Sequence, residues 1–300
     1  MRVYGSIRTG LRAITLTVVA LAALAGCGLE HAAPGTAVTI TVTRDFGAAT
    51  MGSAVISHPP GGTTALGMLQ RRFQVRVGAG SSVRAVGGVA AGATGRWALY
   101  INGVASRARA RVHPGDRLWW DLQDSGVRPL AAVGSFPEPF VHGIGGRRYP
   151  STLECAGDVA AACRHLAAVL TRAGVPISSQ APGTGSGQDS ITLVVGTWHE
   201  IRAELVATLL ESGPRTSGVF ARFEGGSLQL LGGHGQVVST LGPGAGLIAA
   251  VAANSAPPTW LVVGATERGV AAAAKAFSAS RLRDHFALAV SGDHALPVPQ

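Results

Sequence analysis

Few polar residues in this chain have the spacing of a catalytic site. Trp198-His199-Glu200 follows a predicted strand, at the rim where open α/β sheets bind ligands, and His beside Glu has the residue types of acid–base catalysis. Neighbours at a helix start do not face each other, so helix capping is the favoured interpretation. Gly185-Ser186-Gly187 lacks the G-x-S-x-G pattern of hydrolase nucleophiles, and the histidines include no H-x-H or H-E-x-x-H pair. We therefore expect that the protein is not an enzyme.

A glycine-rich turn has some features of a nucleotide-binding loop. Gly242-Pro243-Gly244-Ala245-Gly246 lies between a predicted strand at 236–241 and a predicted helix at about 246–254, and Glu267 follows about twenty residues on. The glycines do not have the G-x-G-x-x-G spacing of a dinucleotide site. A tight turn between strand and helix is the favoured interpretation.

The first cysteine follows a segment typical of bacterial lipoproteins. Three arginines precede an apolar stretch at 13–24, which is short for a membrane span. Leu24-Ala25-Gly26-Cys27 resembles a lipobox, which implies cleavage before Cys27 and acylation of that cysteine, as with palmitate. We expect a signal peptide at 1–26, a tether at 27–36, and a lipid anchor that holds the body at the extracytoplasmic face of the bacterial cell membrane. A plain secretory signal is the alternative.

The other two cysteines form an even pair in an oxidising compartment. Cys155 precedes a predicted helix at 158–173 and Cys163 lies inside it, so a disulfide that fixes the helix start is the simplest use of both. Asp158 is the expected N-cap. His165 raises the alternative of a metal site, but no second Cys/His cluster has ligand spacing. We expect a disulfide and no metal.

Arginines alternate with small residues after a predicted strand at 97–101 and an Asn102-Gly103 reversal. Arg107, Arg109 and Arg111 would lie on one face of a strand, and Ala108 and Ala110 on the other. With a three-residue loop at 114–116, the next strand would place Trp119 opposite Arg111 and Asp121 opposite Arg109. The net charge is +9, and only this arginine face resembles the basic cluster of a nucleic-acid site, so a solvated strand face is the favoured interpretation and nucleic acid is not the expected partner.

Aromatic residues concentrate in the same region. By alternation, Trp97 and Trp120 belong to the core, whereas Tyr100 and Trp119 face outward. Outward aromatic rings contact a ligand, pack against a second domain, or remain exposed, and the sequence leaves all three open.

These residues carry a resemblance to a known family. W-x-x-Y-I-N-G-V at 97–104 and G-D-x-L-W-W at 115–120 resemble the transcobalamin C-terminal-like family, and the likeness extends over residues 37–125. It implies a β-grasp domain, with a first strand at 38–47 and a helix capped by Thr63 or Thr64. It also implies a cobalamin-like corrinoid as the small-molecule ligand. The candidate ligand contacts are Tyr100, Asn102, Arg109, Arg111 and Trp119.

The rest of the chain predicts a second, α/β domain. A loop at 47–62 lies within the first domain, and a Pro/Gly-rich connector at 126–150 follows it. Strand and helix patterns then alternate over 151–292, ahead of a tail at 293–300. Leu193–Thr197 and Leu261–Ala265 are similar strand ends, each followed by a predicted helix, as in an internal β-α duplication. The expected fold class is α+β: a β-grasp domain followed by an α/β sandwich.

Two functions fit these patterns. The first is an extracytoplasmic lipoprotein that binds a small molecule through its β-grasp domain, beside a transporter or an enzyme. The second is a cell-envelope interaction module that docks a protein or an anionic wall polymer through the Arg107/Arg109/Arg111 face. The chain lacks the long helical domain of vitamin carriers, which argues against complete enclosure of cobalamin.

Overall fold

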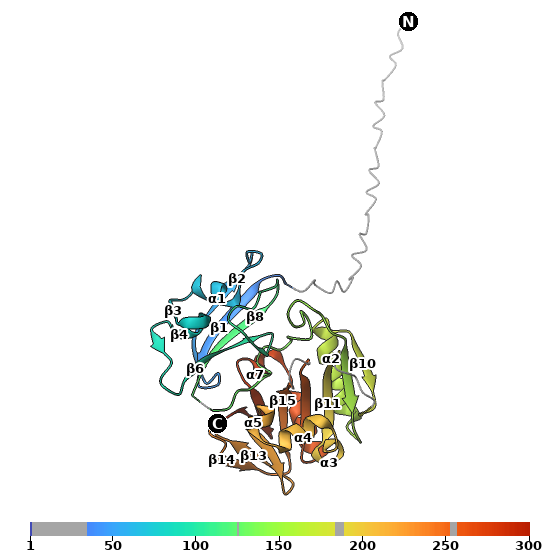
Figure 1. The fold of residues 1–300 in the computed structure, drawn as a ribbon. Helices are drawn as coiled ribbons and strands as arrows, with labels where there is room; N and C mark the ends of the chain where they lie inside the picture. The colour runs from blue at the N-terminus through green and yellow to red at the C-terminus, as the bar shows by residue number, and fades with distance from the viewer. Residues whose placement is uncertain (2–34, 125, 184–188, 253–256) are drawn as a thin grey trace. The chain divides into compact units, whose positions relative to one another are not determined.

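The computed structural model describes residues 1, 35–124, 126–183, 189–252 and 257–300 (Figure 1). The described residues from 35 onward belong to one compact unit that spans Ala32–Gln300. The predicted lipobox at Leu24–Cys27 and the Gly185-Ser186-Gly187 motif lie outside the described residues. The chain has a mixed α+β fold with more strand than helix.

The N-terminal part, residues 35–124, is built on a five-stranded sheet. Strand β1 pairs in parallel with β8 and antiparallel with β2, while β8 also pairs antiparallel with β6. The expected loop at 47–62 is wrong for half of its length, because Ala49–Ile56 forms a strand. In spatial order the strands are β2 (Ala49–Ile56), β1 (Val38–Arg44), β8 (Arg117–Gln123), β6 (Arg96–Ile101) and β7 (Val104–Ser106).

One face of this sheet is closed by a short helix and a small second sheet. Thr64 caps helix α1 (Ala65–Gln70) by accepting a hydrogen bond from the amide of Gly67, as the sequence predicted. Leu66 and Leu69 of α1 are buried against the strand residues Ile40, Leu118 and Trp120. The small sheet contains β3 (Val75–Val77), β4 (Val83–Val86) and β5 (Val89–Ala90), with a 3₁₀ turn at Ala79–Ser81.

The predicted strand through the alternating arginines is wrong. Strand β8 is already hydrogen-bonded on both edges, to β1 and to β6, so no edge remains for residues 107–111. That segment runs beside α1 instead, where Ala110 and Ala108 carbonyls accept bonds from the amides of Ala65 and Leu66. The expected pairs Arg111–Trp119 and Arg109–Asp121 do not form, because Trp119 and Asp121 are buried.

The C-terminal part, residues 126–300, is built on a seven-stranded sheet. The predicted helix at about 246–254 is wrong, because Ala245–Val251 is a fully buried central strand. The predicted tail also contributes a strand, at the sheet edge. In spatial order the strands are β10 (Ile177–Gln180), β9 (Ser151–Cys155), β11 (Ile191–Thr197), β16 (Thr259–Gly264), β15 (Ala245–Val251), β17 (Ala287–Ser291) and β18 (His294–Val298).

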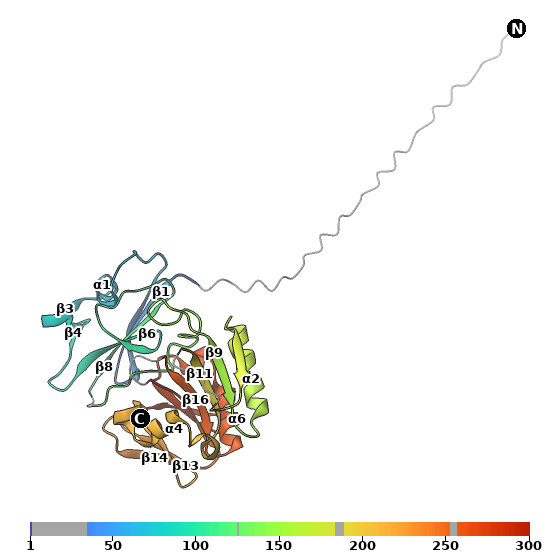
Figure 2. The same ribbon diagram turned by 45° about the vertical axis from the view of Figure 1, so that its right-hand side comes forward.

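Both faces of the larger sheet are covered. Helices α2 (Ala160–Arg172) and α6 (Glu267–Ala276) pack on one face (Figure 2). The other face is covered by the short helices α4 (Leu205–Glu211) and α5 (Pro214–Ser217) with a three-stranded sheet, and also by aromatic residues of the N-terminal part. The three-stranded sheet contains β12 (Ala221–Glu224), β13 (Ser227–Leu231) and β14 (Val237–Leu241). The remaining helices are α3 (Trp198–Ile201) and α7 (Ala279–Leu282).

Aromatic residues of the predicted connector at 126–150 pack into the C-terminal part. Phe136 and Phe140 are buried against Trp260, with ring centroids 6.1 and 5.1 Å from it. The two predicted domains share one buried core, in which Phe46, Tyr100 and Trp119 pack with residues of the C-terminal part, within one compact unit. The similar segments at 193–197 and 261–265 lie on neighbouring parallel strands, each followed by a helix in the chain.

Candidate functional site

The site is built on the face of the N-terminal sheet that points away from its own core. Period-two alternation sends Val38, Ile40 and Val42 into the core and the intervening threonines to the opposite face. The parallel register then pairs Thr39 with Arg117 and Thr41 with Trp119. These neighbouring residues place hydroxyls, a guanidinium and an indole on one surface.

A cleft of about 520 Å³ lies over this surface. Its floor comes from β1, β2 and β8, and its opposite wall comes from residues 134–135 of the connector and 283–284 of the loop before β17. The volume is in the range of small-molecule sites. The cleft is lined by Thr39, Ile40, Thr41, Thr50, Ser53, Ala54, Val55, Arg117, Leu118, Trp119, Gly134, Ser135, Arg283 and Asp284.

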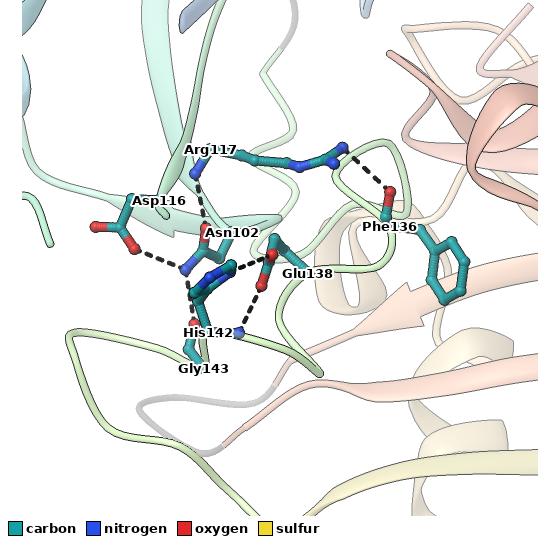
Figure 3. A network of polar contacts seen from close by, with 7 residues as sticks. All are labelled: Asn102, Asp116, Arg117, Phe136, Glu138, His142 and Gly143. Carbon is teal, nitrogen blue, oxygen red and sulfur yellow. Dashed lines mark hydrogen bonds and ion pairs between the residues drawn. The ribbon is translucent and has the colours of Figure 1, made fainter. Parts of the chain in front are cut away.

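Arg117 is held in the cleft by a polar network from both parts of the chain (Figure 3). Its backbone amide donates to Asn102 Oδ1 at 2.8 Å, and its Nη1 donates to the Phe136 carbonyl at 3.2 Å. Asn102 Nδ2 donates to Asp116 Oδ1 and to the Gly143 carbonyl, both at 2.8 Å. Burial raises the pKa of the Asp116 carboxyl, against the lowering effect of its bonds to His113 and Asn102.

A Glu–His pair on the connector lies beside this network (Figure 3). Glu138 accepts two hydrogen bonds from His142, one from the backbone amide at 2.8 Å and one at Nδ1 at 2.7 Å. The ring bond is the main cause that raises the pKa of His142, and burial opposes it. This pair fixes the turn whose earlier residues, Gly134 and Ser135, form the cleft wall.

A second buried network lies beneath Trp119. Its Nε1 donates to Thr43 Oγ1 at 2.7 Å, and Thr43 donates in turn to Asp121 Oδ1 at 2.6 Å. The amide of Gly47 also donates to that oxygen, at 3.0 Å. Burial raises the pKa of Asp121 to about 6 despite these bonds. Trp119 therefore has a fixed ring position at the cleft floor.

The outward orientation predicted for Tyr100 and Trp119 is correct with respect to the N-terminal core, but neither ring faces solvent. Both pack against Phe286 of the C-terminal part, at centroid distances of 5.1 and 4.6 Å. Tyr100 is 0% exposed and its hydroxyl donates to the Pro129 carbonyl, so it contacts no cleft. Of the three alternatives left open, packing between the two parts is the one that the structure shows for these rings.

The other candidate ligand contacts separate into two groups. Asn102 is 0% exposed, and its side chain bonds to the Gly143 carbonyl and the Arg117 amide, so in this structure it positions Arg117 and does not line the cleft. Arg109 and Arg111 are exposed, as is Arg107, and they lie outside the cleft. The structure thus brings only Trp119, of the five candidates, to the cleft.

The remaining sequence motifs have structural roles. Cys155 and Cys163 form the predicted disulfide, although Asp158 does not cap α2, because the helix begins later, with Val159 at the N-cap. Thr197 and Glu200 form a capping box at the start of α3, which confirms capping over acid–base pairing of His199. The turn at 242–246 connects two strands, and so lacks the helix of a dinucleotide site.

Sequence reasoning missed the residues of the opposite wall. Ser135 was assigned to a connector, and Arg283 and Asp284 to the region of a last strand, so none was linked to Trp119. Asp284 has φ of 60°, and burial raises the pKa of its carboxyl. Alternation places Arg117 and Trp119 on the same face of β8. The sequence carries no local signal that residues 134–135 and 283–284 lie opposite this face.

Comparison with known proteins gives no match to a family model, a curated protein or a solved structure. Within the described ranges, no group of three or more His, Cys, Asp or Glu side chains is arranged to hold a metal ion. None of the helices among the described residues combines the length and apolar character needed to cross a membrane.

Proposed function

We propose that this protein is an extracytoplasmic, lipid-anchored binding protein, not an enzyme, that holds a small polar molecule in the cleft above β1 and β8. The observation that carries the proposal is the composition of that cleft. Arg117 and Arg283 supply positive charge, threonine and serine hydroxyls supply hydrogen bonds, and Trp119 supplies an apolar floor. A few placed polar groups on a largely preformed concave surface are typical of small-molecule sites.

Two arginines and one carboxyl group, that of Asp284, line the cleft, and this excess of positive groups favours a ligand with carboxylate, phosphate or amide oxygens. A guanidinium donates several hydrogen bonds in a fixed geometry, which suits such oxygens. Arg117 is already oriented by Asn102 and by the Phe136 carbonyl, so binding orders fewer side chains. Burial lowers the pKa of His285 beside the wall, which disfavours a further positive charge there, so the positive charge of the cleft comes from Arg117 and Arg283.

A β-grasp arrangement of the N-terminal part belongs to this proposal. It is supported by a first strand that pairs with β2 on one side and, in parallel, with the last strand β8 on the other, with α1 between them in the chain. The resemblance to transcobalamin C-terminal-like modules makes a corrinoid the first ligand to test. A corrinoid is larger than the cleft, so its amide-bearing edge would be bound and the rest left open.

The anchor is proposed on the lipobox-like residues before Cys27. Acylation of Cys27 would place the protein at the outer face of the cell membrane, beside a transporter or enzyme that uses the ligand. In cells, the wild-type chain should incorporate labelled palmitate and fractionate with membranes. Cys27→Ala should abolish both; incorporation by this variant, or membrane retention without any lipid, would contradict the anchor.

The binding proposal is tested by titrating the chain from Gly28 with cobalamin and with cobinamide. Calorimetry and the absorption spectrum of the corrinoid measure the binding. Arg283→Gln should weaken binding about 10- to 100-fold, since it removes charge-assisted hydrogen bonds worth about 1.5–3 kcal/mol. Arg281→Gln is the matched control, because it is an exposed arginine two residues away that does not line the cleft. Equal loss in both variants would contradict the cleft as the binding site.

A further inference from the structure

One long stretch of the N-terminal part contains arginines and no acids. From residue 46 to residue 115 the sequence has no Asp or Glu, although Asp45 and Asp116 flank it directly. Eight arginines lie in the stretch, and all except Arg96 are exposed. The exposed seven, called here the arginine surface, are Arg71, Arg72, Arg76, Arg84, Arg107, Arg109 and Arg111.

The fold brings the elements that carry these arginines together. Helix α1, β3 and β4 lie side by side at one end of the N-terminal sheet in both views (Figures 1 and 2). The loop at 107–111 is hydrogen-bonded to α1 through the Leu66 amide and the Ala108 carbonyl. Arg109 Nε donates to Ser81 Oγ at 2.6 Å, which joins that loop to the turn between β3 and β4.

The charge of this surface is not neutralised within the described part of the chain. None of the seven guanidiniums forms an ion pair there; the arginines that do are Arg44, Arg147 and Arg222. Val77, which follows Arg76 on β3, is also exposed, at 40%. Unpaired, exposed basic side chains suit an anionic interface such as a layer of phospholipid headgroups.

The point where the chain enters the fold is close to this surface. The Gly115 amide donates to the Thr36 carbonyl at 3.0 Å, and Arg111 is four residues before Gly115. Cys27 is eleven residues before the first residue of β1, so even a fully extended tether reaches at most about 40 Å. An anchor on Cys27 would thus hold the start of β1 within about 40 Å of the membrane, which the arginine surface can reach by rotation of the folded part.

We infer that the arginine surface docks on the anionic phospholipid headgroups of the membrane that carries the anchor. This inference rests on the proposed acylation of Cys27, which supplies the proximity, while the arginines supply orientation. Acyl chains and basic side chains together give more durable membrane binding than either alone. Docking through α1, β3 and the 107–111 loop leaves the cleft, on the opposite face of the same sheet, free for ligand.

The test uses the unlipidated chain from Gly28 and two kinds of vesicle, one of phosphatidylcholine and phosphatidylglycerol in equal parts and one of phosphatidylcholine alone. The variant Arg76→Gln/Arg107→Gln/Arg111→Gln removes three charges from the arginine surface. At about fivefold per arginine, its partition coefficient on the anionic vesicles should fall about 100-fold at low salt. The effect should shrink as salt is added, and neutral vesicles should not bind the wild-type chain.

A control variant removes the same charge elsewhere. Arg164→Gln/Arg202→Gln/Arg281→Gln changes three exposed arginines of the C-terminal part and should bind anionic vesicles as the wild type does. Equal losses in the two triple variants would mean that net charge alone drives binding, and would overturn the inference. Equal thermal unfolding midpoints of the variants check that the substitutions leave the fold intact.

Long-chain polyphosphate provides the competing ligand, a soluble anionic polymer. Binding to polyphosphate without binding to anionic vesicles would overturn lipid docking and assign the surface to a wall polymer. Cys27→Ala, studied in cells, tests the anchor separately. A chain that binds vesicles through these arginines but carries no lipid on Cys27 would refute the anchor alone, so the two failures are distinguishable.

Discussion

Phe286 is the residue that joins the two parts of the chain most directly. Its ring is 3% exposed and contacts three aromatic side chains of the N-terminal part. The centroid distances are 4.6 Å to Trp119, 5.1 Å to Tyr100 and 5.4 Å to Phe46. Phe286→Ala would leave a cavity where these rings meet, between two sheets that cannot both relax into it.

The expected cost follows from burial and ring geometry. Replacing a buried Phe by Ala lowers the free energy of unfolding by about 3–5 kcal/mol, and tilted or edge-on aromatic pairs contribute about 0.5–1.5 kcal/mol each beyond their area. With three such pairs lost at once, we expect a value near the top of the range, about 5 kcal/mol. Urea unfolding followed by tryptophan fluorescence measures it, because Trp119 is in contact with the ring.

Phe223→Ala is the matched control. Phe223 is half-buried and stacks on Trp198 alone, at 5.0 Å, within the C-terminal part. Its loss should cost about 1–2 kcal/mol, because less area is buried and one ring contact is removed. A Phe286→Ala cost no larger than that of the control would refute the conclusion that this ring holds the two parts together.

Three further predictions concern the residues that shape the site. Gly134→Ala should lower the free energy of unfolding by about 1–3 kcal/mol in urea titrations and weaken ligand binding, because the new Cβ would lie 2.8 Å from the His285 amide nitrogen. Gly126→Ala is the control: no atom lies within 4 Å of a Cβ at that position, so neither stability nor binding should change. Folding raises the pKa of Asp121 from 3.8 to about 6, so the protonated carboxyl stabilises the folded state. This contribution to the free energy of unfolding is complete below about pH 4, and about 3 kcal/mol of it is lost as the pH rises through 6. Asp121→Asn should remove this dependence, so parallel pH profiles of variant and wild type would contradict it. Cys163→Ser should lower the free energy of unfolding by about 2.5 kcal/mol, because the unfolded chain is no longer constrained by a disulfide between residues eight positions apart. An unchanged urea midpoint would argue against the disulfide.

Alternation and capping were the sequence signals that predicted structure well. The V-T-I-T-V-T run specifies which face of β1 is buried, since only one register places Val38, Ile40 and Val42 in the core. Thr63 and Thr64 were both predicted as possible N-caps because the apolar spacing of α1 begins directly after them, and the structure shows that Thr64 is the cap. Both signals depend on residues close together in sequence.

The failures came from patterns whose meaning depends on distant neighbours. The alternating arginines have strand periodicity, yet both edges of β8 are taken by β1 and β6, so this segment has no strand partner in the five-stranded sheet. The run Ala245–Val251 is apolar on both faces because it lies in the middle of the seven-stranded sheet, and such a run cannot be told from a buried helix by period alone.

The cleft could be predicted only in part. The alternation of β8 places Arg117 and Trp119 on the same face, but Ser135 and Arg283 reach that face only through the fold of the C-terminal part. Asn102 looked like a ligand contact because it is polar and lies in a turn. Its burial, and its bonds to Asp116 and Gly143, are long-range facts that the sequence does not carry locally.

The most direct test of the central claim, that the cleft binds a small molecule, is hydrogen–deuterium exchange of the chain from Gly28 with and without saturating cobinamide. Binding in the cleft should slow exchange in the β1–β2 segment, at residues 134–135 and at residues 283–284, with little change in α1 or at 107–111. Protection confined to the arginine surface, or to the far face of the seven-stranded sheet under α2 and α6, would contradict the cleft. Unchanged exchange at every segment would contradict corrinoid binding itself.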